Sequence, residues 1–173
     1  MKLYILRHAE AVDHDDPKFK DADRPLTPKG IERTRLLAHV LRQMEIGFDV
    51  ILTSPLLRAK DTAEILERGL RLHDAVQASE HLKPGGSVDR LIDQINSLKP
   101  APDAVVLVGH EPFLSGLIST LCTGGSGLVV TLKKGALCRM EVETLRAAQC
   151  ASLEWLLQPR VIGFKPPKRK KGS

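Results

Sequence analysis

The sequence Leu3-Tyr4-Ile5-Leu6-Arg7-His8-Ala9-Glu10-Ala11 places a short apolar run directly before an arginine and a histidine. The apolar run predicts a buried strand, so Arg7 and His8 come where that strand leaves the core. In open α/β sheets, ligands bind just outside the carboxyl ends of the strands. A fixed cation beside an imidazole at that edge favours the binding and attack of an anion, with phosphate as the first candidate.

Further short apolar runs predict the other strands of a sheet. Residues 50–53, 75–79 and 104–108 each form such a run, and the third is the most apolar in the chain. Beyond residue 121, three more runs predict strands that close the sheet, antiparallel ones among them: residues 129–132, 137–142 and 152–157.

Helix patterns separate the first strands. Thr27-Pro28 and Ser54-Pro55 both have the signature of a helix start, an N-cap hydroxyl followed by proline at the first helical position. Ser87 predicts the cap of a third helix, and a fourth helix is predicted after Gly109-His110-Glu111-Pro112. Strands that alternate with helices predict an α/β fold, a three-layer α/β/α arrangement with a largely parallel central sheet.

The charge balance separates the end of the chain from the rest. Five of the 26 basic residues lie at the end of the 173-residue chain, and they are Lys165, Lys168, Arg169, Lys170 and Lys171. The other 21 basic residues equal the acidic residues in number, since the chain has 21 of these. We therefore expect one domain over residues 1–162 and a disordered basic tail over 163–173. A solubilising end is the simpler interpretation of this tail, and weak attraction to an acidic partner is the alternative.

Composition excludes several classes of protein. The aromatic content of 3% argues against a single-stranded nucleic-acid platform, so nucleic acid is not an expected partner. Three widely spaced cysteines form neither a paired disulfide framework nor a CxxC motif. No apolar run approaches the ~18 residues of a membrane span and no signal peptide is evident, so we expect a cytoplasmic protein without membrane contact.

Four polar residues are predicted to meet at one edge of the sheet. Arg7 and His8 follow the first strand, Arg58 lies in the first turn of the helix after the second strand, and His110 follows the strand at 104–108. Parallel strands place their carboxyl ends together, so these side chains are expected to converge. Arginines suit the oxygens of a phosphoryl group, and a neutral imidazole can attack phosphorus without a metal or cofactor.

Three motifs at these positions resemble those of the histidine phosphatase superfamily in order and spacing. They are Leu6-Arg7-His8-Ala9-Glu10, Ser54-Pro55-Leu56-Leu57-Arg58-Ala59 and Val108-Gly109-His110-Glu111-Pro112. The resemblance covers roughly residues 2 to 160 and is greatest to the small SixA-type phosphohistidine phosphatases. It implies a phosphoglycerate mutase-like fold in a minimal version, without a large helical insertion.

The resemblance also implies a role for each matching residue. His8 is the nucleophile that becomes phosphorylated, while Arg7, Arg58 and His110 hold the phosphoryl oxygens. Many members of the superfamily have glycine after the Arg-His pair. This chain has Ala9, which the SixA-like branch tolerates.

Three further residues are weaker candidates for the same site. Glu80 occupies the position from which many members supply the acid that protonates the leaving group. Arg24 and Thr27 are expected to border the phosphate pocket, although Thr27 also has a structural role as N-cap. No group of side chains has metal-ligand spacing, so no metal site is expected.

These residues predict a phosphatase that acts through a phosphohistidine on His8. Only about thirty residues separate the second helix from the strand at 104–108, which predicts an open, shallow site. The expected substrate is therefore phosphohistidine in a protein, and a small phosphate ester is the first alternative. A phosphate-binding interaction protein without catalysis is the alternative of another class, and the sequence indicates no oligomeric state.

Overall fold

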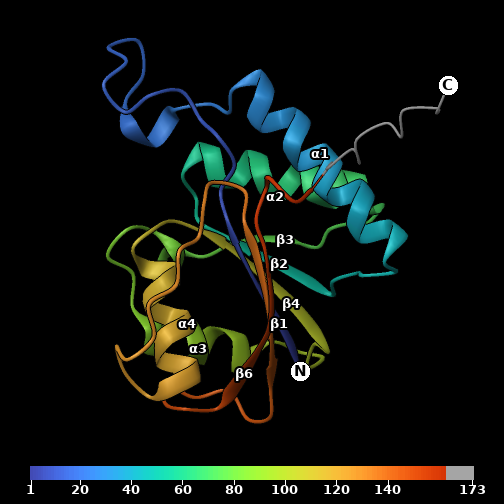
Figure 1. The fold of residues 1–173 in the computed structure, drawn as a ribbon, viewed down its shortest axis with the longest axis vertical. Coiled ribbons are helices and arrows are strands. Elements are labelled where there is room, and N and C mark those ends of the chain that lie inside the picture. Colours follow the sequence, from blue (N-terminus) through green and yellow to red (C-terminus); the bar gives the residue numbers. More distant parts are fainter. Residues whose placement is uncertain (163–173) are drawn as a thin grey trace, which may run out of the picture.

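A six-stranded sheet forms the centre of the protein in the computed structural model, which describes residues 1–162 (Figure 1). Its strands lie in the order β3-β2-β4-β1-β5-β6. Their bounds are β1 Lys2–Arg7, β2 Val50–Thr53, β3 Val76–Ala78, β4 Ala104–Gly109, β5 Leu137–Val142 and β6 Ala151–Leu157. The first four strands run parallel, whereas β5 pairs antiparallel with β1 and β6 pairs antiparallel with β5. The predicted largely parallel sheet is therefore confirmed.

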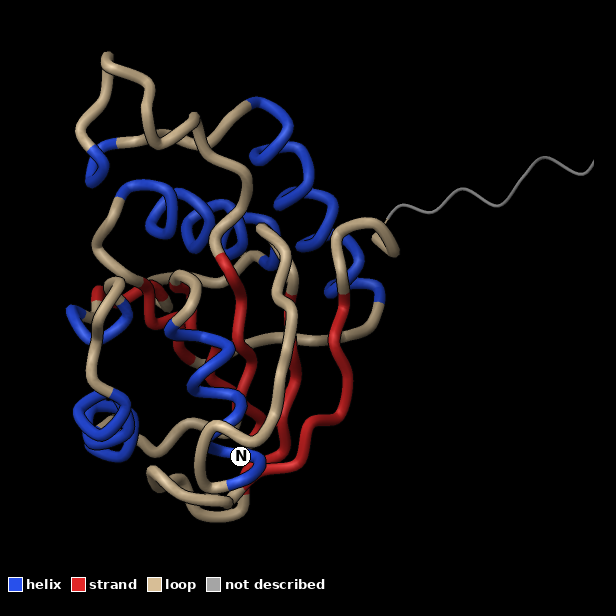
Figure 2. The backbone as a smooth tube through the Cα atoms, turned by 60° about the vertical axis from the view of Figure 1, so that its left-hand side comes forward, coloured by secondary structure: helices blue, strands red, loops and turns tan. Residues whose placement is uncertain are grey.

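Helices cover both faces of this sheet (Figure 1 and Figure 2). They are α1 Pro28–Gln43 and α2 Leu57–Leu70 on one face, and α3 Val88–Ser97 and α4 Phe113–Thr123 on the other. Successive side chains of a strand point to opposite faces. In β1, accordingly, Leu3 and Ile5 pack with α3 and α4, while Tyr4 and Leu6 pack with α1 and α2. The three-layer α/β/α prediction is confirmed.

The chain between α2 and β4 is short. It holds only β3, the 3₁₀ turn η2 Glu80–Leu82 and α3. No large helical insertion stands between these elements, as the minimal version of the fold predicts. None of the helices in residues 1–162 is long and apolar enough to cross a membrane. The basic tail predicted for residues 163–173 lies outside the described residues.

Two of the three predicted helix caps are confirmed. The Thr27 hydroxyl accepts a hydrogen bond from the Gly30 N–H at 3.0 Å, and Ser87 accepts one from the Arg90 N–H at 3.4 Å. The Ser54 cap is wrong, because α2 begins at Leu57 and its N-cap residue is Leu56. Two further residues carry the chain from β2 into α2. The buried Ser54 hydroxyl accepts a hydrogen bond from the Leu56 N–H at 3.4 Å, before the helix begins, and also contacts a histidine.

The strand predicted at residues 129–132 is also wrong. β5 occupies the edge of β1 and β6 pairs with β5, and the segment 129–132 pairs with none of the six strands. Its backbone groups bond to side chains instead: the Leu132 carbonyl accepts from Arg7 at 2.8 Å and the Thr131 carbonyl from Gln158 at 2.6 Å. Val129 is 93% exposed, which a buried strand would not allow.

The loop after β1 closes on itself before α1 begins. The Thr27 N–H donates to the Glu10 carbonyl at 2.9 Å, and Ala11 forms an antiparallel bridge with Leu26. Gly30 completes the closure, since a Cβ at this position would lie 2.1 Å from the Glu10 carbonyl oxygen. This closure holds the two ends of the loop, residues 10–11 and 26–27, against each other.

Replacing Gly30 therefore tests the loop closure. Gly30→Ala should lower the free energy of unfolding by about 1–3 kcal/mol, because a methyl group is forced against fixed backbone. Gly116 is the matched control, since it also lies within a helix but a Cβ added there would meet no neighbouring atom within 4 Å. Gly116→Ala should raise stability by roughly 0.5–1 kcal/mol through helix propensity. Urea unfolding measures both, and equal effects in the two variants would contradict the close approach.

Candidate active site

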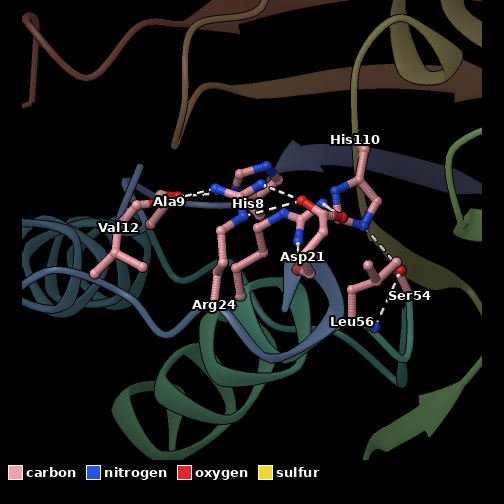
Figure 3. Close-up of polar contacts among 9 residues, drawn as sticks. His8, Ala9, Val12, Asp21, Arg24, Ser54, Leu56 and His110 are labelled. Carbon is pink, nitrogen blue, oxygen red and sulfur yellow. Dashed lines mark hydrogen bonds and ion pairs between the residues drawn. The ribbon is translucent and has the colours of Figure 1, made fainter. Parts of the chain in front are cut away.

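The structure brings His8 and His110 together at the carboxyl edge of the parallel strands (Figure 3). Each follows the last residue of its strand, and the β1–β4 register aligns Arg7 with Gly109. The two imidazole rings are 4.9 Å apart between centroids and tilted by 52°. The predicted convergence of these two histidines is therefore seen in the geometry.

The His8 ring is held in one tautomer. Its Nδ1 lies 2.8 Å from the Ala9 carbonyl oxygen, and a carbonyl only accepts, so Nδ1 carries the hydrogen and Nε2 keeps a lone pair. Burial lowers the pKa of His8 to about 3, although the bond to Ala9 acts in the opposite direction. The positive charges of Arg58 and Arg7 lower it further, as does repulsion between the protonated forms of His8 and His110. His8 is therefore a neutral imidazole with a free Nε2 at neutral pH.

His110 is buried and neutral as well. Its Nε2 lies 2.8 Å from the Ser54 hydroxyl, and its Nδ1 is buried without a hydrogen-bond partner among the described residues. Burial, followed by the charge of Arg58, lowers the pKa of His110 to about 4. Two neutral imidazoles thus stand side by side, each fixed through one ring nitrogen.

Arg58 is fixed by an acidic residue that the sequence analysis did not single out. Its Nη1 donates to the Asp21 carbonyl at 2.7 Å, and its Nη2 lies 3.4 Å from the Asp21 carboxylate. Asp21 belongs to the 3₁₀ turn η1 Asp21–Asp23, within the loop after β1. The Arg58 side chain is buried, and its Nε has no hydrogen-bond partner among residues 1–162.

Arg24 binds the other oxygen of the same carboxylate (Figure 3). Its Nε and Nη2 donate to one Asp21 oxygen at 3.0 and 2.8 Å, and its Nη1 donates to the Val12 carbonyl at 2.7 Å. Burial alone would raise the pKa of Asp21, but the hydrogen bonds and charges of Arg24 and Arg58 together lower it. Arg24 thus reaches the site through Asp21, next to Arg58.

Arg7 points from the end of β1 toward the segment before β5. Its Nη1 donates to the Leu132 carbonyl at 2.8 Å, while its Nε is buried without a partner in the described chain. Buried N–H groups are costly to leave unpaired, and guanidinium N–H groups suit oxyanions. In both Arg7 and Arg58, therefore, Nη1 is held by a carbonyl oxygen, while the Nε–H group has no partner among residues 1–162 and can bind an anion.

Among residues 1–162, Glu80 and Thr27 bond to partners outside this cluster. The Glu80 side chain is 68% exposed in η2 and forms an ion pair with Lys83 at 2.5 Å. Within residues 1–162, no hydrogen bond or ion pair joins Glu80 to Arg7, His8 or the other cluster residues. The Thr27 hydroxyl is engaged in the α1 cap and in a 3.3 Å contact to the Glu10 carbonyl.

Two hydroxyl residues that the sequence analysis missed connect the strand ends. Thr62 of α2 accepts a hydrogen bond from the Ala9 N–H at 3.1 Å and donates to the Arg58 carbonyl at 2.7 Å. Ser54, the first residue after β2, contacts His110. Its position at a strand end was a usable signal, but the following proline favoured interpretation as a helix cap.

The arrangement is suited to an oxyanion and an attacking imidazole. It combines two neutral histidines with two arginines whose Nε atoms have no partner in the described part of the chain. In the part of the chain that the structure describes, no group of three or more His, Cys, Asp or Glu residues is arranged to hold a metal ion.

Comparisons with known proteins agree with this arrangement. The family described as "Histidine phosphatase superfamily (branch 1)" matches residues 3–83. An uncharacterised protein of Picosynechococcus is 43% identical over 79% of this chain and 82% of its own. Phosphohistidine phosphatase SixA of Escherichia coli is 32% identical over 72% of this chain and 76% of its own.

A solved structure extends the similarity to the fold. The protein histidine phosphatase SixA complexed with tungstate superposes with a TM-score of 0.77 at 25% identity, covering 92% of this chain and 98% of that one. The fold is thus a phosphoglycerate mutase-like α/β fold in its minimal form. The chain belongs to the histidine phosphatase superfamily, and it is similar to the SixA proteins within it.

The lowered pKa of His8 predicts how stability depends on pH. The folded value of about 3 lies below the ordinary value of 6.5, so the unfolded chain binds the proton first and stability falls as pH drops below about 6.5. Between pH 7 and pH 5, His8→Gln should therefore lose about 2 kcal/mol less stability than the wild type.

Urea unfolding in phosphate-free buffer measures this difference. His39→Gln, which changes an exposed histidine of α1, is the matched control and should follow the wild type. A His8→Gln curve parallel to that of the wild type would show that His8 is not held neutral in the folded protein.

Proposed function

We propose that the protein is a phosphatase in which Nε2 of His8 attacks a phosphoryl group. The observation that carries the proposal is the His8 tautomer, because the Ala9 carbonyl binds Nδ1–H and leaves the Nε2 lone pair free. That lone pair forms the new N–P bond while the bond from phosphorus to the leaving atom breaks. Water then attacks phosphorus and releases phosphate, which returns His8 to its neutral form.

Arg7, Arg58 and His110 are proposed to hold the phosphoryl oxygens during both steps. The Nε atoms of Arg7 and Arg58 are buried and have no partner among residues 1–162, and the same holds for Nδ1 of His110. Donors fixed in advance stabilise the charge that builds up on the oxygens in the transition state. Asp21 fixes Arg58 through its Nη atoms, and Arg24 contributes by holding Asp21.

Glu80 is proposed as the acid for substrates with a poor leaving group. It is exposed in the turn after β3, beside the carboxyl edge of the sheet. A phosphorylated imidazole needs this acid less, because its P–N bond is intrinsically labile. That Thr27 borders the phosphate pocket stays a prediction.

The proposed substrate is a phosphohistidine in a protein. Two features support this choice: the similarity to proteins named phosphohistidine phosphatase and protein histidine phosphatase, and the short chain between α2 and β4. A site without a helical cover can admit a side chain that remains attached to a folded protein. A small phosphate ester is the alternative substrate.

Removing the nucleophile tests the mechanism. His8→Ala should reduce phosphate release from an aryl phosphate by at least about 10³-fold, because the proposed nucleophile that forms the N–P bond is removed. His39→Ala, at an exposed position of α1, should retain wild-type activity. Circular dichroism checks that both variants fold, and substantial turnover by folded His8→Ala would refute the mechanism.

Wild-type activity should persist in EDTA, since the proposed steps use no metal.

A substrate comparison tests the second part of the proposal. A histidine-phosphorylated protein should be hydrolysed with a kcat/KM at least about tenfold above that of any sugar or nucleotide phosphate, a difference of about 1.4 kcal/mol. Phosphate release measured under initial-rate conditions provides the comparison. A marked preference for one metabolite would assign the enzyme to the small-ester alternative.

A further inference from the structure

A groove lined by positive side chains begins at Arg7. It has a volume of about 720 Å³, and its basic residues come from four separate parts of the chain. We call it the basic groove; it is lined by Arg7, Glu10, Arg33, Lys133, Lys134, Gln158, Pro159 and Arg160. Of these residues only Arg7 belongs to the proposed catalytic cluster.

Main-chain hydrogen bonds attach the groove to the catalytic cluster. The Gly135 N–H donates to the carbonyls of Arg7 and His8, both at 3.1 Å, and the Arg7 N–H donates to the Ala136 carbonyl at 3.1 Å. Gly135 has a φ of +80°, a conformation that glycine adopts without strain. The turn that presents Lys133 and Lys134 is thereby held against the backbone of Arg7 and His8.

The positive charges of the groove are largely uncompensated within residues 1–162. Arg33, Lys133, Lys134 and Arg160 form no ion pair within 4.0 Å in this part of the chain. Glu10 is the one acidic residue that lines the groove, and Lys29 already pairs with it at 2.9 Å. Lys29, and more weakly Arg33, lower the pKa of Glu10. An anion in the groove therefore meets several cations that have no ion-pair partner among the described residues.

An acidic surface adjoins the basic groove. A neighbouring hollow of about 790 Å³ shares Glu10 and Lys134 with it and is also lined by Asp13, Asp15 and Asp16. The two signs of charge thus lie side by side next to the catalytic cluster. A small polyphosphate gains nothing from the acidic half. A protein surface with both kinds of charge can pair with both halves and fix its orientation.

We propose that the basic groove binds acidic side chains that flank the phosphorylated residue of a protein substrate. This inference rests on the proposed function, since it assigns the substrate class of the same catalytic site. The basic groove and the neighbouring acidic hollow both open at the surface. Carboxylates that project from a folded partner can therefore reach the basic groove. Charge pairing of this kind accelerates association and selects between partners more than it changes the chemical step.

Two synthetic peptides phosphorylated on histidine test the groove. They have equal length, and one carries aspartates on both sides of the phosphohistidine where the other carries asparagines. The variant Arg33→Gln/Lys133→Gln/Lys134→Gln removes three charges from the groove and leaves Arg7 in place. Its KM for the acidic peptide should rise about tenfold or more with kcat unchanged, while kcat/KM for the neutral peptide and an aryl phosphate stays within about twofold.

The matched control is Lys2→Gln/Lys99→Gln, two exposed lysines at the opposite edge of the sheet. This variant should retain the wild-type KM for both peptides. With the wild type, raising NaCl from about 50 to about 300 mM should raise KM for the acidic peptide only, because salt screens exposed charges. This second measurement does not depend on the folding of any variant.

The outcomes separate this inference from the proposed function. Wild-type turnover of the aryl phosphate supports the catalytic proposal, and its absence refutes that proposal. Given turnover, equal KM values of the wild type for the two peptides would refute the groove proposal, as would equal effects of the groove and control variants. Fructose 1,6-bisphosphate serves as a small substrate with two phosphates. If the groove variant lost more kcat/KM for this compound than for the acidic peptide, the groove proposal would also be refuted, because the groove would then bind a second phosphate.

Discussion

The parallel pairing of β1 with β4 is the contact on which the site depends. Its register runs from Lys2 opposite Ala104 to Arg7 opposite Gly109, and the His8 N–H continues the ladder to the Gly109 carbonyl at 3.0 Å. A slip of one residue would move every side chain to the other face of the sheet. The apolar residues of both strands therefore fix the register, and the register places His8 beside His110.

The site combines this rigid frame with costly buried polar groups. His8 is 6% exposed, Arg58 4% and His110 2%, and burying such groups costs free energy unless they are hydrogen-bonded. Each has one fixed partner, respectively the Ala9 carbonyl, Asp21 and Ser54. The same burial keeps both imidazoles neutral, so the cost in stability is also what makes the His8 lone pair available. A bound oxyanion supplies the acceptors that the arginine Nε atoms lack within residues 1–162.

The sequence was sufficient for those features that follow from strand ends. Arg7, His8 and His110 follow apolar runs directly, so the topology alone brings them to one edge. The sequence was insufficient where a contact between residues far apart in the chain determines the local structure. Asp21 is one of several aspartates in its loop, and only the folded loop shows that it lies between Arg24 and Arg58. Residues 129–132 have the pattern of a strand, yet β5 already occupies the edge of β1.

Mapping the phosphoryl group on the reacting enzyme is the most direct test of the central claim. The enzyme is mixed with an aryl phosphate, quenched in alkali, which preserves phosphohistidine, and digested for mass spectrometry, with phosphorus NMR to distinguish the two ring nitrogens. Because Nδ1 of His8 is bound to the Ala9 carbonyl, the account predicts phosphate on Nε2 of His8. Phosphate on Nδ1 of His8 or on another residue, or turnover without any phosphorylated enzyme, would contradict it.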